Sequence, residues 1–246
     1  MRRLVLGACV LIGLGLAPDV RAERVLRICE TERELQPISS PKGDAPGQKL
    51  VRAAAQAMGD RVTFTPLPWR RCIADLRHGH YDGAIGVVPT ETFLTTLKFP
   101  ETGGVPDPRR SLGDLSFVVV RRIGAAPSWD GNRFTGLDLP VLYDAASQIV
   151  TQKLKRLGAP AEPVPLAESQ MIDMLHRGRS DIAIGRRDMI EALLRAPETA
   201  GDVEMLPQPF VQAPAYLAFG SPFAESSPGY ADRLWDEVGR LRATVP

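Results

Sequence analysis

Side chains that commonly perform catalysis or bind metal ions are sparse in this sequence. Its histidines, His78, His80 and His176, each fall in a predicted helix-end turn beside a glycine. His78 and His80 together suggest a metal site, but no third ligand lies in register with them, so we expect solvated surface histidines. The sequence contains no Gly-x-Ser-x-Gly elbow, no phosphate-binding loop and no zincin motif. We therefore expect no metal, no cofactor and no hydrolase chemistry.

The first 22 residues predict a cleavable signal peptide. Arg2 and Arg3 form a basic start, an apolar run covers Leu4–Leu16, and a Val-Arg-Ala sequence ends at Ala22. The apolar run is too short to span a bilayer as a helix, and no later segment is long enough. Lipidation at Cys9 is the alternative, but the apolar run continues past that residue. We expect export to the periplasm as residues 23–246.

Two cysteines remain after removal of that segment, Cys29 and Cys72. Because lone thiols usually pair in an oxidising compartment, we predict a Cys29–Cys72 disulfide. In the chain-entropy model, a loop of this size stabilises the fold by roughly 4 kcal/mol. A pair of buried, unreacted thiols is the alternative. Two cysteines without flanking histidines are too few for a structural zinc site.

The charge balance excludes one class of partner. The whole chain has 30 basic and 29 acidic residues, which gives a formal net charge of +1. The predicted signal peptide holds three arginines and one aspartate, so the exported chain has a net charge of −1. Since no basic stripe is present, we expect no nucleic-acid partner. The length allows one large domain or two modest ones.

One sequence pattern occurs twice. Leu76–Gly86 has the sequence LRHGHYDGAIG and Leu175–Gly185 has LHRGRSDIAIG, 99 residues further on. In each copy a helical apolar pattern leads to a glycine that can end a helix in the left-handed conformation. An aspartate and a short run that is apolar on both faces follow, as a central parallel strand requires. The two copies predict two lobes built alike.

Each copy thus predicts a return from a helix to a strand of the sheet. The rest of the chain predicts further elements around these two helix-to-strand returns. Strands are expected at Val25–Cys29, Val62–Pro66, Leu115–Val120, Pro140–Tyr143 and Tyr216–Phe219, and helices at Gly47–Met58, Arg70–Arg77, Ser147–Leu157 and Tyr230–Leu241. Ser147 stands at a helix start, where we expect it to act as a cap. Two stretches rich in Pro and Gly, 103–108 and 207–214, are candidate crossings between the lobes.

Several short motifs now carry a resemblance to a known family. They are LRICE ending at Glu30, PWRRC at Pro68–Cys72, the LRHGHYDGAIG return, Thr90–Pro100 ending in KFP, and WDG at Trp129–Gly131. In their order and spacing, the chain resembles a type II periplasmic solute-binding protein of the superfamily that serves amino-acid ABC transporters. It is most similar to a branch that has a Cys after the first strand and a Pro-Trp-x-Arg-Cys motif. The resemblance covers essentially all of residues 23–246.

The resemblance implies an α/β fold of two lobes, each a mostly parallel sheet flanked by helices, with two hinge crossings. Residues 23–113 and 215–246 would form the first lobe, and residues 114–214 the second. A small-molecule ligand would lie between them, at the carboxyl ends of strands and at helix N-termini. Binding would proceed by hinge closure around the ligand.

Two positions depart from the pattern of amino-acid binders. Such proteins hold the ligand carboxylate with the Arg of a Thr-x-x-Arg sequence, but this chain has Thr90 followed by Phe93. They hold the ligand ammonium with an Asp after the second return strand, where this chain has Arg186 and then Arg187. Both anchors of an α-amino acid are missing. Together with a helix N-terminus at Ser147–Gln148, Arg186 would suit an anion or a carboxylate better.

The resemblance and the predicted elements together nominate eight ligand-binding residues. Trp69 aligns with an aromatic residue that stacks on the ligand in relatives, and Glu30 takes the place of an acidic contact at a strand end. Each has a structural alternative: Trp69 as a core residue, Arg70 as cover for a helix flank, Tyr143 as a strand-end tyrosine, and Arg186 as a solvated arginine. The full set is Glu30, Trp69, Arg70, Thr90, Tyr143, Ser147, Gln148 and Arg186.

We expect a monomeric binding protein that presents a small polar or anionic solute to an inner-membrane ABC permease. The alternative is an accessory or sensory protein that signals to a membrane partner through the same closure. A third possibility is a dehydratase of the cyclohexadienyl type, because some of these resemble the fold, but fold alone implies no activity. Such an enzyme needs a positioned acid, and Glu30 is the candidate. We expect no enzymatic activity.

Overall fold

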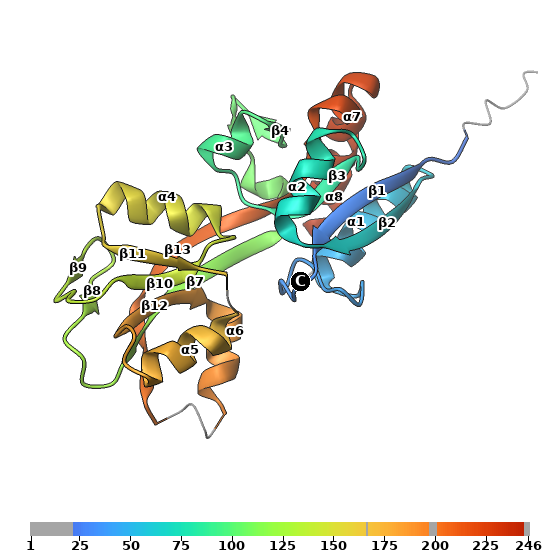
Figure 1. Cartoon of the computed structure of the whole chain (residues 1–246). Coiled ribbons are helices and arrows are strands. Elements are labelled where there is room, and N and C mark those ends of the chain that lie inside the picture. Colours follow the sequence, from blue (N-terminus) through green and yellow to red (C-terminus); the bar gives the residue numbers. More distant parts are fainter. Residues whose placement is uncertain (1–21, 166, 197–200, 244–246) are drawn as a thin grey trace, which may run out of the picture.

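The computed structural model describes residues 22–165, 167–196 and 201–243. The signal peptide that the sequence predicts falls almost wholly on residues 1–21, outside the described residues. Two α/β halves make up the described chain, and two long strands run between them (Figure 1).

The first lobe is built on a central parallel strand. Strand β1 (Val25–Thr31) lies between β2 (Arg61–Leu67) and β3 (Gly83–Val87), parallel to both. The antiparallel β13 (Val203–Gly220) borders β3, and the short β4 (Leu97–Lys98) adds to β13. The helices of this lobe are α1 (Pro46–Ala57), α2 (Trp69–Arg77), α3 (Glu91–Leu94), α7 (Ser221–Ser226) and α8 (Tyr230–Arg242).

The second lobe repeats this plan. Strand β10 (Val141–Asp144) lies between β11 (Ala161–Val164) and β12 (Ile182–Arg186), parallel to both, and β7 (Gly113–Arg122) is antiparallel to β12. A small hairpin of β8 (Ser128–Trp129) and β9 (Phe134–Thr135) is added at its side. Its helices are α4 (Gln148–Leu157), α5 (Glu168–His176) and α6 (Arg187–Leu194).

Strands β7 and β13 join the two lobes. The strand order β11-β10-β12-β7-β13-β3-β1-β2 runs through both of them. Strand β13 pairs with β7 from Val203 to Ala215 and then with β3 from Tyr216 onwards. Gly113 starts β7 opposite Ala215, with a positive φ of 143° that side chains rarely adopt. The two strands thus pass side by side from one lobe to the other (Figure 1).

Of the two stretches expected as crossings, residues 103–108 take another place, whereas residues 207–214 lie in the crossing strand β13. Residues 103–108 lie in a hairpin of β5 (Glu101–Thr102) and β6 (Val105–Pro106) and at the start of a short 3-10 helix, η1 (Pro108–Arg110). A pair of glycines makes the turn of that hairpin, which explains the local composition. Residues 207–214 belong to β13 itself, whose register against β7 shifts around Pro209.

The repeated pattern is the helix-to-strand return that the sequence predicts. Gly79 follows α2 with φ +75° and Gly178 follows α5 with φ +66°, the left-handed conformation that glycine adopts without strain. The aspartate that follows each glycine contacts a neighbouring strand, β1 for Asp82 and β7 for Asp181. Asp82 accepts a hydrogen bond from the backbone N of Arg27 at 2.8 Å, and Asp181 pairs with Arg122. Strand β3 is then fully buried, and β12 is buried except at its last residue.

The predicted disulfide is present. Cys29 of β1 and Cys72 of α2 are bonded, with their Cα atoms 5.6 Å apart at a sequence separation of 43. Both are fully buried in a core cluster that also holds Ile73, Leu76 and Tyr216. The bond fixes the N-terminal half of α2 against the central strand of the first lobe. This half of the helix carries Trp69 and Arg70.

Candidate functional site

A cavity of about 320 Å³ has walls from both lobes. Its size falls within the range of small-molecule pockets, roughly 300–1,000 Å³. The first lobe contributes residues of α2 and of the turn at α3, and the second lobe contributes the segment between β10 and α4. The lining residues are Trp69, Arg70, Ile73, Arg77, Thr92, Phe93, Ala145, Ala146 and Gln148.

Helix α2 supplies four of the lining residues. Trp69, Ile73 and Arg77 are four residues apart, so they share one face of the helix, and Arg70 lies beside Trp69. Trp69 is half-buried against the cluster around the disulfide, whereas Arg70 is exposed. Arg77 donates a hydrogen bond of 3.5 Å to Thr96 Oγ1. Trp69 and Arg70 therefore lie at the wall of an inter-lobe cavity, and their contact with a ligand remains a prediction.

The short helix α3 adds an aromatic surface to the first-lobe wall. Phe93 lines the cavity and is 6% exposed, because most of its ring packs into the same cluster as the disulfide. Thr90 does not line the cavity. It caps α3 instead, with its buried hydroxyl oxygen accepting a 3.4 Å hydrogen bond from the backbone N of Phe93. Phe93, which stands at the position of the arginine in the Thr-x-x-Arg sequence of amino-acid binders, thus presents an apolar face to the cavity.

The second-lobe wall is the start of α4. Ala145, Ala146 and Gln148 line the cavity. Ser147 occupies the N-cap position as predicted, but its hydroxyl makes no capping bond, which corrects that expectation. Its Oγ is buried and has no hydrogen-bond partner in the described chain. The first N–H groups of α4 therefore have no side-chain cap, and such groups favour negative charge.

The charged side chains that line the cavity are all positive. Arg70 and Arg77 line it, and no acidic residue of the described chain does. Arg70 has no hydrogen-bond or ion-pair partner among the described residues, so its charge is available. The nearest acid on the second-lobe side, Asp144, is engaged: it accepts from the backbone N of Ala146 at 2.9 Å and pairs with Arg33 at 3.0 Å.

Glu30 lies outside the cavity lining. It is 1% exposed, and its Oε2 accepts a 2.6 Å hydrogen bond from Gln48 Nε2. Burial raises the pKa of Glu30 to about 7, against the lowering effects of the Gln48 hydrogen bond and the charge of Arg52. Gln48 also bonds Ser40 through both ends of its amide. Through these hydrogen bonds, Glu30 and Gln48 connect β1 and α1 to the loop that follows β1.

Arg186 and Tyr143 also lie outside the lining. Tyr143 is 7% exposed and belongs to the main core cluster. Arg186 holds the carboxylate of Asp188 in bidentate fashion, at 3.1 and 2.6 Å, and donates a further hydrogen bond to the backbone carbonyl of Glu34. Its guanidinium is therefore occupied and connects the two lobes. A role for either side chain in ligand binding remains a prediction.

Some lining residues were not among the eight predicted. Ile73 and Arg77 could have been found from the sequence, since they stand one and two helical turns after Trp69. Thr92, Ala145 and Ala146 carry no such signal, because which loop residues reach a cavity depends on how the lobes pack together.

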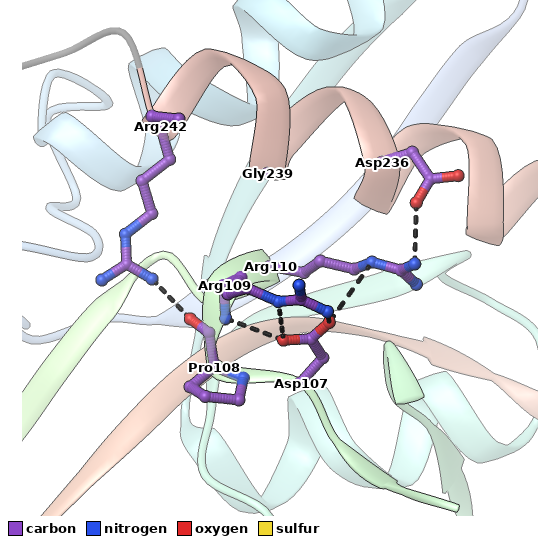
Figure 2. Close-up of a pocket in the computed structure, with 8 residues that line it drawn as sticks. Asp107, Pro108, Arg109, Arg110, Asp236, Gly239 and Arg242 are labelled. Atoms are coloured by element: carbon purple, nitrogen blue, oxygen red, sulfur yellow. Dashed lines mark hydrogen bonds and ion pairs between the residues drawn. The ribbon is translucent and has the colours of Figure 1, made fainter. Parts of the chain in front are cut away.

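A second hollow, of about 720 Å³, lies between η1 and α8 on the first lobe alone (Figure 2). Asp107 is 4% exposed there, and the hydrogen bond from Arg109 holds the pKa of its carboxyl well below the usual range. Arg110 pairs with Asp236 at 2.9 Å, and Arg242 donates to the backbone carbonyl of Pro108 at 2.7 Å. Each arginine labelled in Figure 2 thus has a partner within the wall.

In residues 22–165, 167–196 and 201–243, no three His, Cys, Asp or Glu side chains are grouped as metal ligands would be.

No protein-family model and no curated protein matches the sequence. Solved structures match over nearly the whole chain. A histidine kinase sensor domain with similarity to periplasmic binding proteins has a TM-score of 0.67 at 16% identity, with 90% of this chain and 92% of that chain covered. An ancestral arginine-binding protein bound to arginine has a TM-score of 0.65 at 18% identity, with coverages of 91% and 94%. A Streptococcus pneumoniae amino acid ABC transporter substrate-binding protein bound to L-arginine has a TM-score of 0.62 at 14% identity, with 89% of this chain and 90% of that chain covered.

At these identities the comparisons establish the fold. The chain has the two-lobed α/β fold of periplasmic-binding-protein-like domains. This agrees with the fold class that the sequence predicts.

Proposed function

We propose that the protein is an exported solute-binding protein that closes its two lobes on a small polar or anionic molecule. The observation that carries this proposal is the cavity with walls from α2 and α3 on one lobe and from the start of α4 on the other. A ligand in such a place contacts both lobes, so it favours the closed arrangement over any open one.

Direct contacts between the lobes support closure as the working motion. Arg33 of the first lobe pairs with Asp144 of the second at 3.0 Å, and Glu91 of the first pairs with Arg156 of the second. These ion pairs are largely exposed, so each contributes little stability, roughly 0–1 kcal/mol. Contacts this weak can break when the lobes open.

We propose ABC-type uptake as the role, with the protein acting in the periplasm as a monomer. The similarity to substrate-binding proteins of amino acid ABC transporters supports it, as does the predicted signal peptide. In the described part of the chain, no helix has the length and apolarity needed to span a membrane. A sensory or accessory role is the second candidate, because a sensor domain of a histidine kinase is among the structures that share the fold.

We propose further that the protein is not an enzyme. The acid that a dehydratase reaction needs was expected at Glu30, but that carboxyl lies outside the cavity lining and is held by Gln48. Turnover of prephenate or arogenate by the purified protein would contradict this proposal.

A thermal-shift screen of amino acids, organic acids, polyamines and sugars tests the binding function. A ligand that binds only the folded state raises its melting temperature by mass action. Small-angle scattering should then show a more compact particle with the same compound. For the uptake role, deletion of the gene should abolish cellular accumulation of that compound.

A matched pair of variants locates the site. Ala146→Trp fills the second-lobe wall and should remove the ligand response, whereas Ala53→Trp, on the exposed face of α1, should preserve it. Failure of every compound class to shift the melting temperature would count against a solute-binding function.

A further inference from the structure

We propose that the ligand is a small organic anion: a carboxylate on an apolar body, with no ammonium group. This inference rests on the proposed binding function and narrows it to one ligand class. It follows from three properties of the inter-lobe cavity, namely its charge, its lack of any acid to pair with a cation, and its apolar surface.

The first property is a free cation at the cavity wall. Arg70 lines the cavity and has no partner in the described chain. Its neighbour Arg71, by contrast, pairs with Asp75 at 3.4 Å and does not line the cavity. An unpaired guanidinium at the wall of a cavity is a binding group for a carboxylate, which it can hold through two parallel hydrogen bonds.

The opposite wall favours the same charge. Ala145, Ala146 and Gln148 line the cavity at the N-terminal end of the ten-residue helix α4. This end has no side-chain cap, and the buried Ser147 Oγ beside it has no partner in the described chain. A carboxylate between Arg70 and this helix end would contact both lobes at once and thereby hold them closed.

The second property is the absence of a partner for an ammonium group. No acidic residue in the described chain lines the cavity. Two acids that adjoin lining residues in sequence are engaged elsewhere: Asp144 with Arg33, and Glu91 with Arg156. An ammonium group would therefore lose its hydration beside two arginines without gaining a counter-charge, which disfavours any α-amino acid.

The third property is the apolar surface. Trp69, Ile73 and Phe93 on the first lobe face a cavity that Ala145 and Ala146 close from the second. The aromatic side chains offer area for a ring or a short hydrocarbon. At about 320 Å³ the cavity accepts a compact molecule and excludes a peptide or an oligosaccharide.

Three probes that share a phenylethyl body test this inference by calorimetry. They are 3-phenylpropionate, which has the carboxylate alone, L-phenylalanine, which has carboxylate and ammonium, and 2-phenylethylamine, which has the ammonium alone. We expect 3-phenylpropionate to bind roughly tenfold or more tightly than phenylalanine, and the amine not to bind. Butyrate and L-2-aminobutyrate repeat the comparison on a smaller body.

Two arginine variants test the assigned cation. Arg70→Gln should weaken carboxylate binding by roughly tenfold or more, and Arg70→Lys should recover part of it. Arg71→Gln changes the same charge on the same helix and should leave the affinity unchanged. Far-ultraviolet circular dichroism of each variant confirms that α2 is intact.

The outcomes separate this inference from the proposed function. Equal or tighter binding of the amino acids would overturn the ligand class while supporting a solute-binding function. Carboxylate binding that is indifferent to Arg70→Gln would overturn the assigned cation. If no carboxylate in the series binds, the ligand class is wrong, and the wider thermal-shift screen then decides the function.

Discussion

The guanidinium of Arg186, at the end of β12 in the second lobe, donates a hydrogen bond to the backbone carbonyl of Glu34 in the first lobe. The same side chain is 11% exposed and grips Asp188, so its charge is satisfied within the protein. The residue expected from the sequence to contact the ligand anion lies at a contact between the lobes. We predict that this contact acts as a latch, which forms when the lobes close and breaks when they open.

Loss of this contact should loosen the closed arrangement. Arg186→Gln removes a charged hydrogen-bond donor, so we expect a larger radius of gyration without ligand, by small-angle scattering. Ligand affinity should fall roughly tenfold, because a hydrogen bond from a charged group contributes about 1.5–3 kcal/mol. Arg187→Gln is the control, since Arg187 bonds Ser116 and Glu191 of its own lobe. Identical scattering for wild type and Arg186→Gln would contradict the latch.

The disulfide should support both stability and binding. Replacing both cysteines, Cys29→Ala with Cys72→Ala, should lower the free energy of unfolding by roughly 2–5 kcal/mol, as measured in urea. Ligand affinity should fall as well, because the bond fixes the half of α2 that carries Trp69 and Arg70. Alkylation and intact-mass measurement of the wild-type protein, with and without reductant, should show that both thiols are unavailable until reduction. A variant that keeps full stability would show that the bond is dispensable.

Glu30 should make stability fall as pH rises. Its pKa is about 7 in the folded protein and roughly 4.3 in an unfolded chain, so between these values the folded state binds more protons. The stabilisation is therefore complete below about pH 4 and lost as the pH passes 7, with a magnitude of the order of 3–4 kcal/mol. Glu30→Gln cannot titrate and keeps an oxygen for Gln48. Urea unfolding at pH 5 and pH 8 should show a smaller pH effect in the variant, and parallel profiles would exclude this role of Glu30.

The two return glycines offer a matched test of backbone conformation. A Cβ at Gly178 would meet nothing within 4 Å, so Gly178→Ala should cost only the left-handed conformation, about 1–2 kcal/mol. A Cβ at Gly79 would lie 3.3 Å from Pro222, so Gly79→Ala should destabilise more. Gly201→Ala is the control, because Gly201 has open space and no positive φ. Equal melting temperatures for all three variants would show that the left-handed conformation at Gly79 and Gly178 does not require glycine.

Local patterns in the sequence were sufficient for the two helix-to-strand returns and for the disulfide. The sequence around Gly79 and Gly178, read with helical and strand periodicity, predicts the two returns, and the two cysteines of the exported chain predict their bond. These features depend on residues close together in sequence or on the chemistry of one residue type. A helix end at a left-handed glycine needs no information from the rest of the chain.

The tertiary structure decided which side chains meet at the cavity. Glu30 stands at a strand end as expected, but its carboxyl is buried against Gln48 of α1. Arg186 also follows a strand, yet Glu34 and Asp188 take up its hydrogen bonds. Trp69 and Arg70 line the cavity because the disulfide and the packing of α2 place them there. The direction of a side chain at a strand or helix end depends on partners from distant segments, and only the folded chain brings those partners together.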